Sequence, residues 1–200
     1  MNKNVPNILT IMRIVLLPFI FFFWLADFIP YAKFVAIGIF LIAVATDWFD
    51  GKIARKYNLV SNLGKLMDPM ADKLLSCTGL ILIAISGVLP AWAACVTMFV
   101  ILGRDFSIDC LRMVAAKKNI VIAANWSGKI RTAVAMFAMP YLLFMSSNDH
   151  YELFCGTPKT VVDIVGYSLI GIAVVLCAYS WFFYFYDNRA VFKEEPTAKK

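Results

Sequence analysis

The sequence predicts an all-α fold, a polytopic membrane helix bundle with six transmembrane helices. Composition is the first reason, because 62% of the 200 residues are hydrophobic and only 16% are charged. Soluble proteins average ~45–50% apolar and ~25% charged residues, so this chain lacks the polar surface that a soluble domain needs. Six apolar segments of bilayer length, and the turn-forming residues between them, are the other two reasons. We expect residues 1–200 to form a single membrane domain.

The six segments follow one another along the chain, and each comes close to the ~20 residues that a helix needs to cross a bilayer. Pro30 separates the first two, Gly87 and Pro90 separate the third from the fourth, and the polar residues from Ser146 open the connection to the sixth. The first segment is too long for a secretory signal peptide, and no small-residue cleavage site follows it. The expected helices are 7–26, 31–57, 62–86, 91–115, 127–145 and 160–186.

The basic residues predict the orientation of this bundle. Along the expected loops, 16 of the 19 Lys and Arg residues lie near one face, Lys33 and Lys159 lie near the other, and Arg104 lies within the fourth segment. The positive-inside rule therefore places both termini in the cytoplasm, which agrees with an even number of spans. The net charge of +6 fits loops that face anionic membrane lipids. The sequence carries no nucleic-acid-binding motif, so no nucleic acid is expected as a partner.

Four aspartates, Asp47, Asp50, Asp68 and Asp72, stand within 26 residues of this apolar chain. An ionisable side chain at membrane depth is costly and indicates a functional site. The members of the first pair are three residues apart and those of the second are four apart, so each pair shares one helix face. The short connection between the two helices predicts antiparallel neighbours. The two carboxylate pairs would then converge at the cytoplasmic mouth of the bundle.

Four neighbouring carboxylates repel one another unless a cation neutralises them. Oxygen ligands favour a hard divalent cation, Mg²⁺ or Mn²⁺. The lone histidine, His150, is expected on the opposite face, which argues against zinc. Four acids could hold two metals ~3.5–4 Å apart, an arrangement suited to phosphoryl displacement. Gly51 and Ala54 would leave room for a nucleotide beside the acids, and Arg55 could pair with diphosphate oxygens.

The motif D-x2-D-G-x2-A-R-x8-G-x3-D-x3-D resembles the signature of the CDP-alcohol phosphatidyltransferase family. Chain length and span count extend the resemblance to the whole chain. The opening N-x2-T-x2-R at Asn7, Thr10 and Arg13, with the runs 103–105 and 127–132, is most similar to the members that make phosphatidylglycerol phosphate. The fixed positions of the motif are filled by Asp47, Asp50, Gly51, Ala54, Arg55, Gly64, Asp68 and Asp72.

The resemblance implies a reaction in which CDP-diacylglycerol and sn-glycerol 3-phosphate give phosphatidylglycerol phosphate and CMP. It also implies a divalent metal, a homodimer in the cell membrane with its active site facing the cytoplasm, and Asp72 as general base. Asp72 is the last acid along its helix, and therefore the best placed to reach the acceptor hydroxyl. The expected metal ligands are Asp47, Asp50, Asp68 and Asp72. The candidate contacts of the CDP-lipid are Asn7, Thr10, Gly51, Ala54, Arg55 and Gly64.

An acceptor that carries a phosphate needs cationic partners. The candidates are Arg104, Arg112, Lys129 and Arg131. Arg104 leads because a charge within an apolar span needs a partner. Alternatives stay open at three places: Arg104 could pair with Asp105 or Asp109, Gly64 could serve only helix packing, and the two cations of the fifth helix could only face lipid headgroups.

Two other functions stay open. The acceptor could be inositol phosphate, phosphatidylglycerol or serine, although the basic residues of the fourth and fifth helices favour a phosphorylated one. A cation transporter also uses acids inside the membrane, but it predicts polar groups across the whole bilayer. The acids of this chain gather at one mouth instead, which favours an enzyme.

Overall fold

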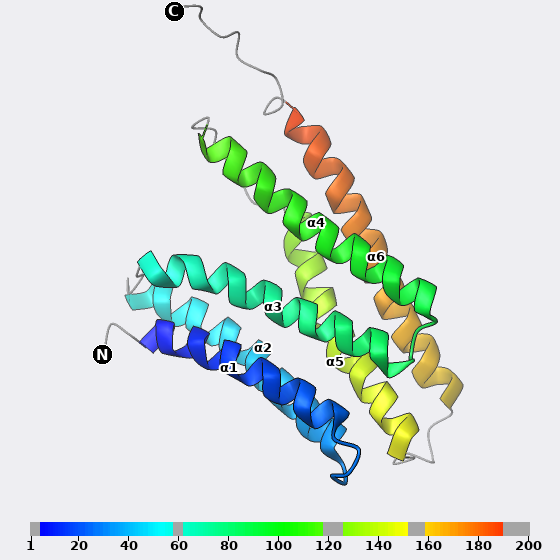
Figure 1. Cartoon of the computed structure of the whole chain (residues 1–200). Coiled ribbons are helices and arrows are strands. Elements are labelled where there is room, and N and C mark those ends of the chain that lie inside the picture. The colour runs from blue at the N-terminus through cyan, green and yellow to red at the C-terminus, as the bar shows by residue number, and fades with distance from the viewer. Residues whose placement is uncertain (1–4, 58–61, 118–125, 152–158, 190–200) are drawn as a thin grey trace, which may run out of the picture.

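The computed structural model describes residues 5–57, 62–117, 126–151 and 159–189, and side chains within 7–46, 67–116, 133–147 and 160–189. These residues form six α-helices and no strand (Figure 1). The all-α prediction is therefore confirmed, and most helix ends lie within two residues of those expected. The helices are α1 (Val5–Leu25), α2 (Ala32–Tyr57), α3 (Asn62–Ser86), α4 (Ala91–Lys117), α5 (Trp126–Tyr151) and α6 (Lys159–Asp187).

The C-terminal end of α5 was predicted wrongly. The polar residues from Ser146 were expected to leave the helix, but α5 continues to Tyr151. Ser147 Oγ donates a hydrogen bond of 3.0 Å to the carbonyl of Leu143 one turn back, and Ser146 Oγ donates one of 3.4 Å to the carbonyl of Ser86 in α3. Since both hydroxyls find acceptors within the bundle, they do not force the helix to end.

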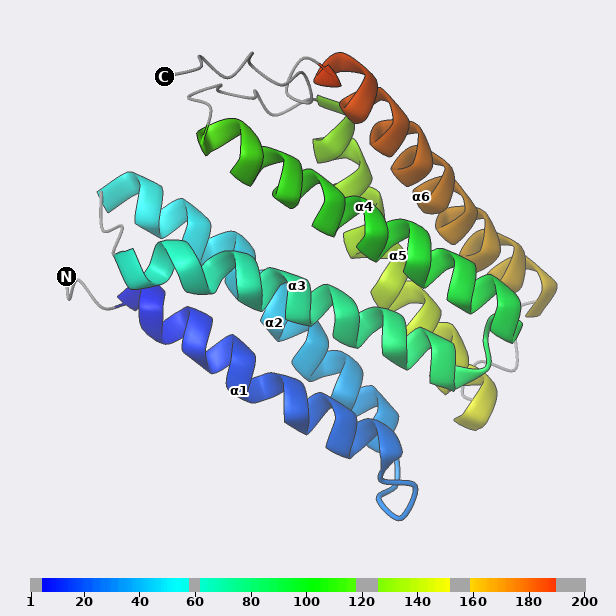
Figure 2. The same ribbon diagram turned by 45° about the horizontal axis from the view of Figure 1, so that its top comes forward.

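Helix α3 lies at the centre of the bundle, in contact with α1, α2, α4 and α5. Helix α1 packs on α2, while α4 and α5 pack on α6 (Figures 1 and 2). The start of α1, the end of α2, the start of α3 and the end of α6 lie toward one end of the bundle, which we call the site end (Figure 2). The aspartate motif therefore lies toward the same end as the described start and end of the chain.

The turn between α3 and α4 makes these two helices antiparallel neighbours. Gly87 follows the last residue of α3 with a φ of 74°, the left-handed conformation in which glycine commonly ends a helix. Ser86 Oγ accepts a hydrogen bond of 3.4 Å from the backbone N–H of Val88. The carbonyl of Pro90 then accepts one of 2.8 Å from the N–H of Ala93 in the first turn of α4. The chain thus reverses over residues 87–90.

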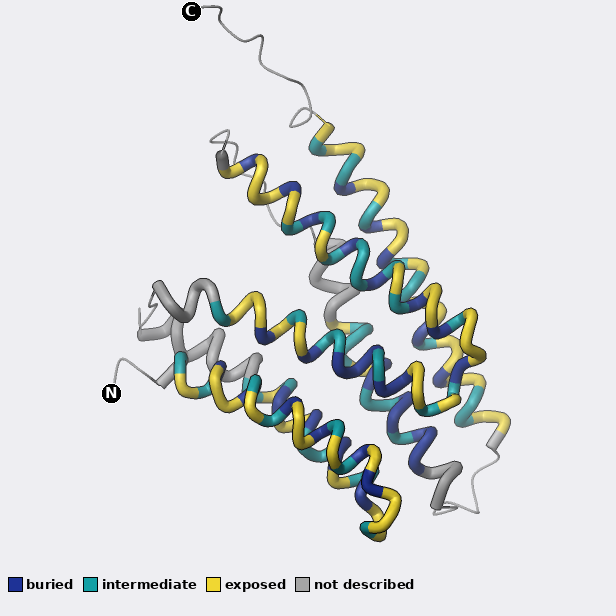
Figure 3. The backbone as a smooth tube through the Cα atoms, in the orientation of Figure 1, coloured by how far each residue is buried: buried dark blue, intermediate teal, exposed yellow. Residues whose placement is uncertain are grey.

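The packing of the helices separates an apolar interior from an apolar outer surface (Figure 3). Ile20, Phe40 and Leu82 are at most 2% exposed between the helices. On the outside, Phe28 and Phe137 are 78% and 75% exposed. Large apolar side chains both inside and outside are typical of helices that contact lipid.

Length and composition support the membrane prediction. Within the described residues, three helical segments are long and apolar enough to cross a bilayer, namely Asn7–Leu25, Met67–Ser86 and Thr160–Asp187. Ala32–Thr46 and Ala133–Ser147 are shorter apolar helical segments. The protein is accordingly an integral membrane protein. That all six helices cross the bilayer, with both termini in the cytoplasm, stays a prediction.

Candidate active site

The four aspartates of the motif lie on two neighbouring helices, α2 and α3. Asp47 lies ten residues before the end of α2, and Asp72 lies ten residues after the start of α3. Asp50 lies seven residues before that end and Asp68 six residues after that start. At 1.5 Å per residue, Asp50 and Asp68 lie about 10 Å from the helix ends that the connection joins. Asp47 and Asp72 lie about 15 Å from the same ends. All four aspartates therefore lie within about one helical turn of one another along the two neighbouring helices.

Helix α1 provides the third side of this region. Thr10, which is completely buried, donates a hydrogen bond of 2.6 Å from its hydroxyl to Oδ1 of Asp68. This bond joins residues that are 58 positions apart in the sequence. The bond orients the Asp68 carboxylate through Oδ1, and Oδ2 could bind a metal. Residues that hydrogen-bond to metal ligands commonly orient them in this way. Thr10 was predicted as a CDP-lipid contact, and its described contact is with a predicted metal ligand.

Arg13 is a further residue of this region that the sequence did not predict. It lies three residues after Thr10, on the same face of α1, and is 1% exposed. An arginine keeps its charge in a protein, so burial at this place requires polar or anionic surroundings. The positive-inside count treats every arginine alike and therefore missed this one. Its spacing from Thr10 within N-x2-T-x2-R was the available signal.

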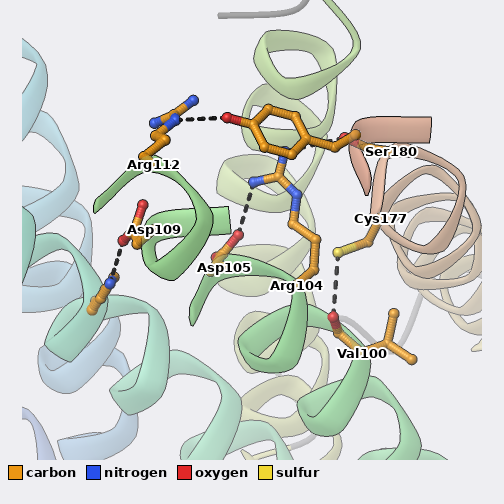
Figure 4. A network of polar contacts seen from close by, with 9 residues as sticks. Val100, Arg104, Asp105, Asp109, Arg112, Cys177 and Ser180 are labelled. Atoms are coloured by element: carbon orange, nitrogen blue, oxygen red, sulfur yellow. Dashed lines mark hydrogen bonds and ion pairs between the residues drawn. The ribbon is translucent and has the colours of Figure 1, made fainter. Parts of the chain in front are cut away.

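Arg104 of α4 is 9% exposed and lies in a polar network between α4 and α6 (Figure 4). Its Nη1 donates a hydrogen bond of 3.0 Å to Oδ1 of Asp105. Its Nη2 donates one of 3.1 Å to Oγ of Ser180 in α6. The pair with Asp105 is one of the alternatives that the sequence left open for this arginine.

Arg112 lies two turns further along α4 and is exposed. Its Nε donates a hydrogen bond of 3.1 Å to the hydroxyl of Tyr184, and its guanidinium carbon lies 5.9 Å from the centre of the Tyr184 ring. This bond uses one of the five N–H donors of the guanidinium and leaves four for other acceptors. Tyr184 was not predicted, because the sequence does not reveal which helix lies beside α4.

Eight predicted site residues are placed by the backbone alone. They lie on α2, α3 and α5, and their side chains fall outside the described ones: Asp47, Asp50, Gly51, Ala54, Arg55, Gly64, Lys129 and Arg131. Asn7 is partly buried, three residues before Thr10 and on the same face of α1. The roles of these nine residues stay predictions.

The donor set suits a hard divalent cation. Asp68 and Asp72 are exposed, one turn apart on α3, and a hydrogen bond already orients the first of them. Carboxylate oxygens are the ligands that Mg²⁺ and Mn²⁺ prefer. Among the described side chains no group of three or more possible metal ligands occurs. The predicted metal site also includes Asp47 and Asp50 of the neighbouring helix α2.

Comparison with known proteins identifies the family of this chain. A family model described as CDP-alcohol phosphatidyltransferase matches residues 3–186. A Bacillus subtilis protein named CDP-diacylglycerol–glycerol-3-phosphate 3-phosphatidyltransferase is 41% identical over 151 residues, which are 70% of this chain and 76% of the relative. Proteins of the same name from Shigella flexneri and Escherichia coli K12 are 32% and 31% identical over 194 residues, covering 95% of this chain and 97% of each relative.

The match with the family extends over nearly all of the described helices, from α1 into α6. It includes the aspartate motif on α2 and α3 and the charged stretch of α4. Members of this family generally depend on a divalent metal, in agreement with the donor set on α3. This integral membrane protein belongs to the CDP-alcohol phosphatidyltransferase family.

Proposed function

We propose that this protein transfers the phosphatidyl group of CDP-diacylglycerol to sn-glycerol 3-phosphate, giving phosphatidylglycerol phosphate and CMP. The observation that carries the proposal is the placement of four aspartates within about one helical turn on the neighbouring helices α2 and α3, with Thr10 of α1 bonded to Asp68. The names of the relatives that cover almost the whole chain support the choice of donor and acceptor.

The acids would hold the reacting groups in place. Asp47, Asp50, Asp68 and Asp72 would bind Mg²⁺ or Mn²⁺, with room for two ions. When bound, a divalent metal supplies positive charge that draws electron density from the diphosphate of the donor. Asn7, Thr10, Gly51, Ala54, Arg55 and Gly64 would line the CDP-lipid site, and the buried hydroxyl of Thr10 would act there through Asp68.

Asp72 would act as the general base of the transfer. Its carboxylate accepts the proton of the glycerol hydroxyl, and the resulting alkoxide attacks the phosphorus that carries diacylglycerol. The bond between that phosphorus and the oxygen that bridges to the cytidylyl phosphate then breaks, and its electron pair leaves with CMP. One P–O bond forms and one breaks, so atoms and charge balance without a further reactant.

The phosphate of the acceptor would bind to the basic residues of α4 and α5. Arg112 is the first candidate, because it is exposed and keeps four donors after its bond to Tyr184. Lys129 and Arg131 belong to the first turns of α5. Arg104 is a weaker candidate than these three, because its guanidinium is already bonded to Asp105 and Ser180.

The setting of the reaction completes the proposal. We place the protein in the cytoplasmic membrane with the site end facing the cytoplasm, where most of its basic residues would meet anionic lipids. We also propose a homodimer, which sedimentation in detergent would test.

The experiment that tests the proposal is CMP release from CDP-diacylglycerol by the purified protein in detergent, with Mg²⁺ or Mn²⁺. Glycerol 3-phosphate, serine, inositol phosphate and phosphatidylglycerol are offered separately. Asp72→Asn should lower the rate by roughly 10²–10⁴-fold, the usual contribution of a general base. Asp163→Asn, which changes an acid of α6 remote from the motif, is the matched control and should leave the rate unchanged.

Each outcome has a clear meaning. Release with glycerol 3-phosphate alone supports both the acceptor and the reaction. Release with another acceptor keeps the family and overturns the proposed acceptor. No release from folded, metal-binding protein would reject the transfer reaction, and a cation transporter would become the leading hypothesis.

A further inference from the structure

An ion pair joins α3 to α4 directly beside Asp72. Nζ of Lys73 pairs with Oδ2 of Asp109, and the two side chains are 27% and 35% exposed. The same Nζ lies 4.8 Å from the centre of the Phe106 ring, a distance at which a cation is attracted to the ring face. Lys73 thus contacts two residues of one turn of α4.

The partner of Lys73 belongs to a longer row of polar side chains. Asp105, Asp109 and Arg112 follow at four and three residues, so they share one face of α4. Asp105 pairs with Arg104, and Arg112 bonds to Tyr184 of α6 (Figure 4). Through Lys73, α3 is therefore connected to the row that continues onto α6.

The position of this pair matters more than its strength. A partly exposed ion pair contributes only ~0–1 kcal/mol to stability on average, and would not be needed merely to hold α3 and α4 together. Lys73 follows Asp72 in α3, and Asp109 lies one turn from Arg112 in α4. The pair therefore connects the helix that carries the proposed base to the helix that carries the first candidate for the acceptor phosphate.

We propose that Lys73 is a positioning residue for the acceptor. By pairing with Asp109 and lying over Phe106, it holds α4 in the register at which a phosphate bound by Arg112 brings its hydroxyl to Asp72. This inference rests on the proposed function. A misplacement of about 1 Å can cost roughly 10²-fold in rate, so a small shift of α4 would be measurable.

A different role for Lys73 predicts the opposite result. If its ammonium bound the acceptor phosphate directly, Asp109 would compete with that phosphate for the charge. Removal of the Asp109 charge would then strengthen acceptor binding. The two roles therefore differ in the sign of the effect of Asp109→Asn on kcat/KM for glycerol 3-phosphate.

The test uses steady-state kinetics of the full chain in detergent, with both substrates varied. The variants are Lys73→Met, Lys73→Arg, Asp109→Asn and the double variant Lys73→Met with Asp109→Asn. Lys33→Met is the matched control, because Lys33, in the first turn of α2, pairs at 3.9 Å with Asp27 of the preceding turn. The apparent melting temperature of each variant shows whether it folds.

We expect Lys73→Met and Asp109→Asn each to lower kcat/KM for glycerol 3-phosphate by roughly 10-fold or more, because the acceptor hydroxyl is misplaced from Asp72. The KM for CDP-diacylglycerol should stay within about twofold of that of the unchanged protein. The double variant should be no worse than either single one, because both remove the same contact. Lys73→Arg should restore most of kcat/KM, and Lys33→Met should change nothing.

Three results would overturn the inference while leaving the proposed function intact, provided that the unchanged protein releases CMP with glycerol 3-phosphate. A higher kcat/KM in Asp109→Asn would assign Lys73 to the phosphate itself. Unchanged kinetics with only a lower melting temperature would make the pair structural. Additive losses in the double variant would mean that the two residues act separately. If Lys73→Met fails to fold, Lys73→Arg and Asp109→Asn still decide between these results.

Discussion

The hydrogen bond between Thr10 and Asp68 links α1 to the aspartate motif. The hydroxyl of Thr10 is completely buried and donates to Asp68. Residues in such places orient a metal ligand and set how well it binds. The spacing N-x2-T-x2-R predicted a CDP-lipid contact at Thr10, and it did not reveal the contact with Asp68.

Thr10→Val should weaken binding of the divalent metal by roughly 10–100-fold, since it removes the bond that orients Asp68. The metal dependence of CMP release, or calorimetric titration with Mn²⁺, measures this change. Thr10→Ser keeps the hydroxyl and should retain most of the affinity. Thr78→Val is the control, because the hydroxyl of Thr78 bonds only within α3, to the carbonyl of Leu74, in its described contact. Equal effects of the two valine variants would contradict the assignment.

Arg112 and Tyr184 allow a second test at the same scale. Arg112→Met removes a charged donor and should raise the KM for glycerol 3-phosphate by roughly 10–100-fold, since hydrogen bonds to charged groups contribute ~1.5–3 kcal/mol. Tyr184→Phe removes only the bond at Nε and should raise the KM by a smaller factor. Tyr179→Phe changes an exposed tyrosine of the same helix and serves as control. An unchanged KM in Arg112→Met would exclude Arg112 from acceptor binding.

At the scale of the helix, Gly79 of α3 lies where two neighbouring helices approach closely. A Cβ atom built at Gly79 would lie 2.9 Å from Sδ of Met139 in α5 and 3.0 Å from Cζ of Phe40 in α2. Small residues let membrane helices pack this closely. Gly79 therefore marks the point where α2, α3 and α5 meet beneath the aspartates.

Gly79→Val should lower the apparent melting temperature, because overpacking a filled interface costs ~1–3 kcal/mol. Differential scanning fluorimetry of the detergent-solubilised protein measures it. The matched control is Gly171→Val in α6, where nothing lies within 4 Å of the added Cβ; a helix interior without contacts tolerates that change. If both variants melt at the temperature of the unchanged protein, the close packing at Gly79 carries no stability.

The helices show which structural information is local. Apolar length, Pro30, Gly87 and Pro90 predicted where the helices begin and end, because bilayer thickness and turn chemistry act on neighbouring residues. The prediction of the end of α5 was wrong, because Ser146 bonds to a carbonyl of α3 that the local sequence does not reveal.

The site also contains residues that local sequence predicts and contacts that it does not. The aspartates were found from their spacing along the chain. The bonds of Arg104 to Ser180, of Arg112 to Tyr184 and of Lys73 to Asp109 depend on which helices are neighbours. Such contacts between distant segments require the assembled bundle.

At the scale of the whole molecule, the bundle has two different ends. The aspartates lie toward the site end, and the α1–α2 turn lies at the other end (Figure 1). Asp27 in that turn has a side chain that is 76% exposed. The positive-inside rule predicts that the site end faces the cytoplasm.

In a background without the native cysteines, Asp27→Cys should react with a membrane-impermeant maleimide in intact spheroplasts. Arg189→Cys, just after α6, should react only after the membrane is permeabilised. The reverse pattern would show that the site end faces outward, in which case the proposed cytoplasmic substrates could not reach it. CMP release by each variant serves as the check that both proteins remain folded.

The contact between Thr10 and Asp68 also has a consequence for biosynthesis. Chains emerge from the ribosome N-terminus first, and domains commonly begin to fold before synthesis ends. Helices α1, α2 and α3 contact one another and carry all four aspartates, so the acidic half of the site is inserted before α4, α5 and α6 are made. Arg104 and Arg112 bond to Ser180 and Tyr184 of α6, so these contacts form only after α6 has been made. The nascent enzyme thus acquires its aspartates before the predicted acceptor residues gain their partners.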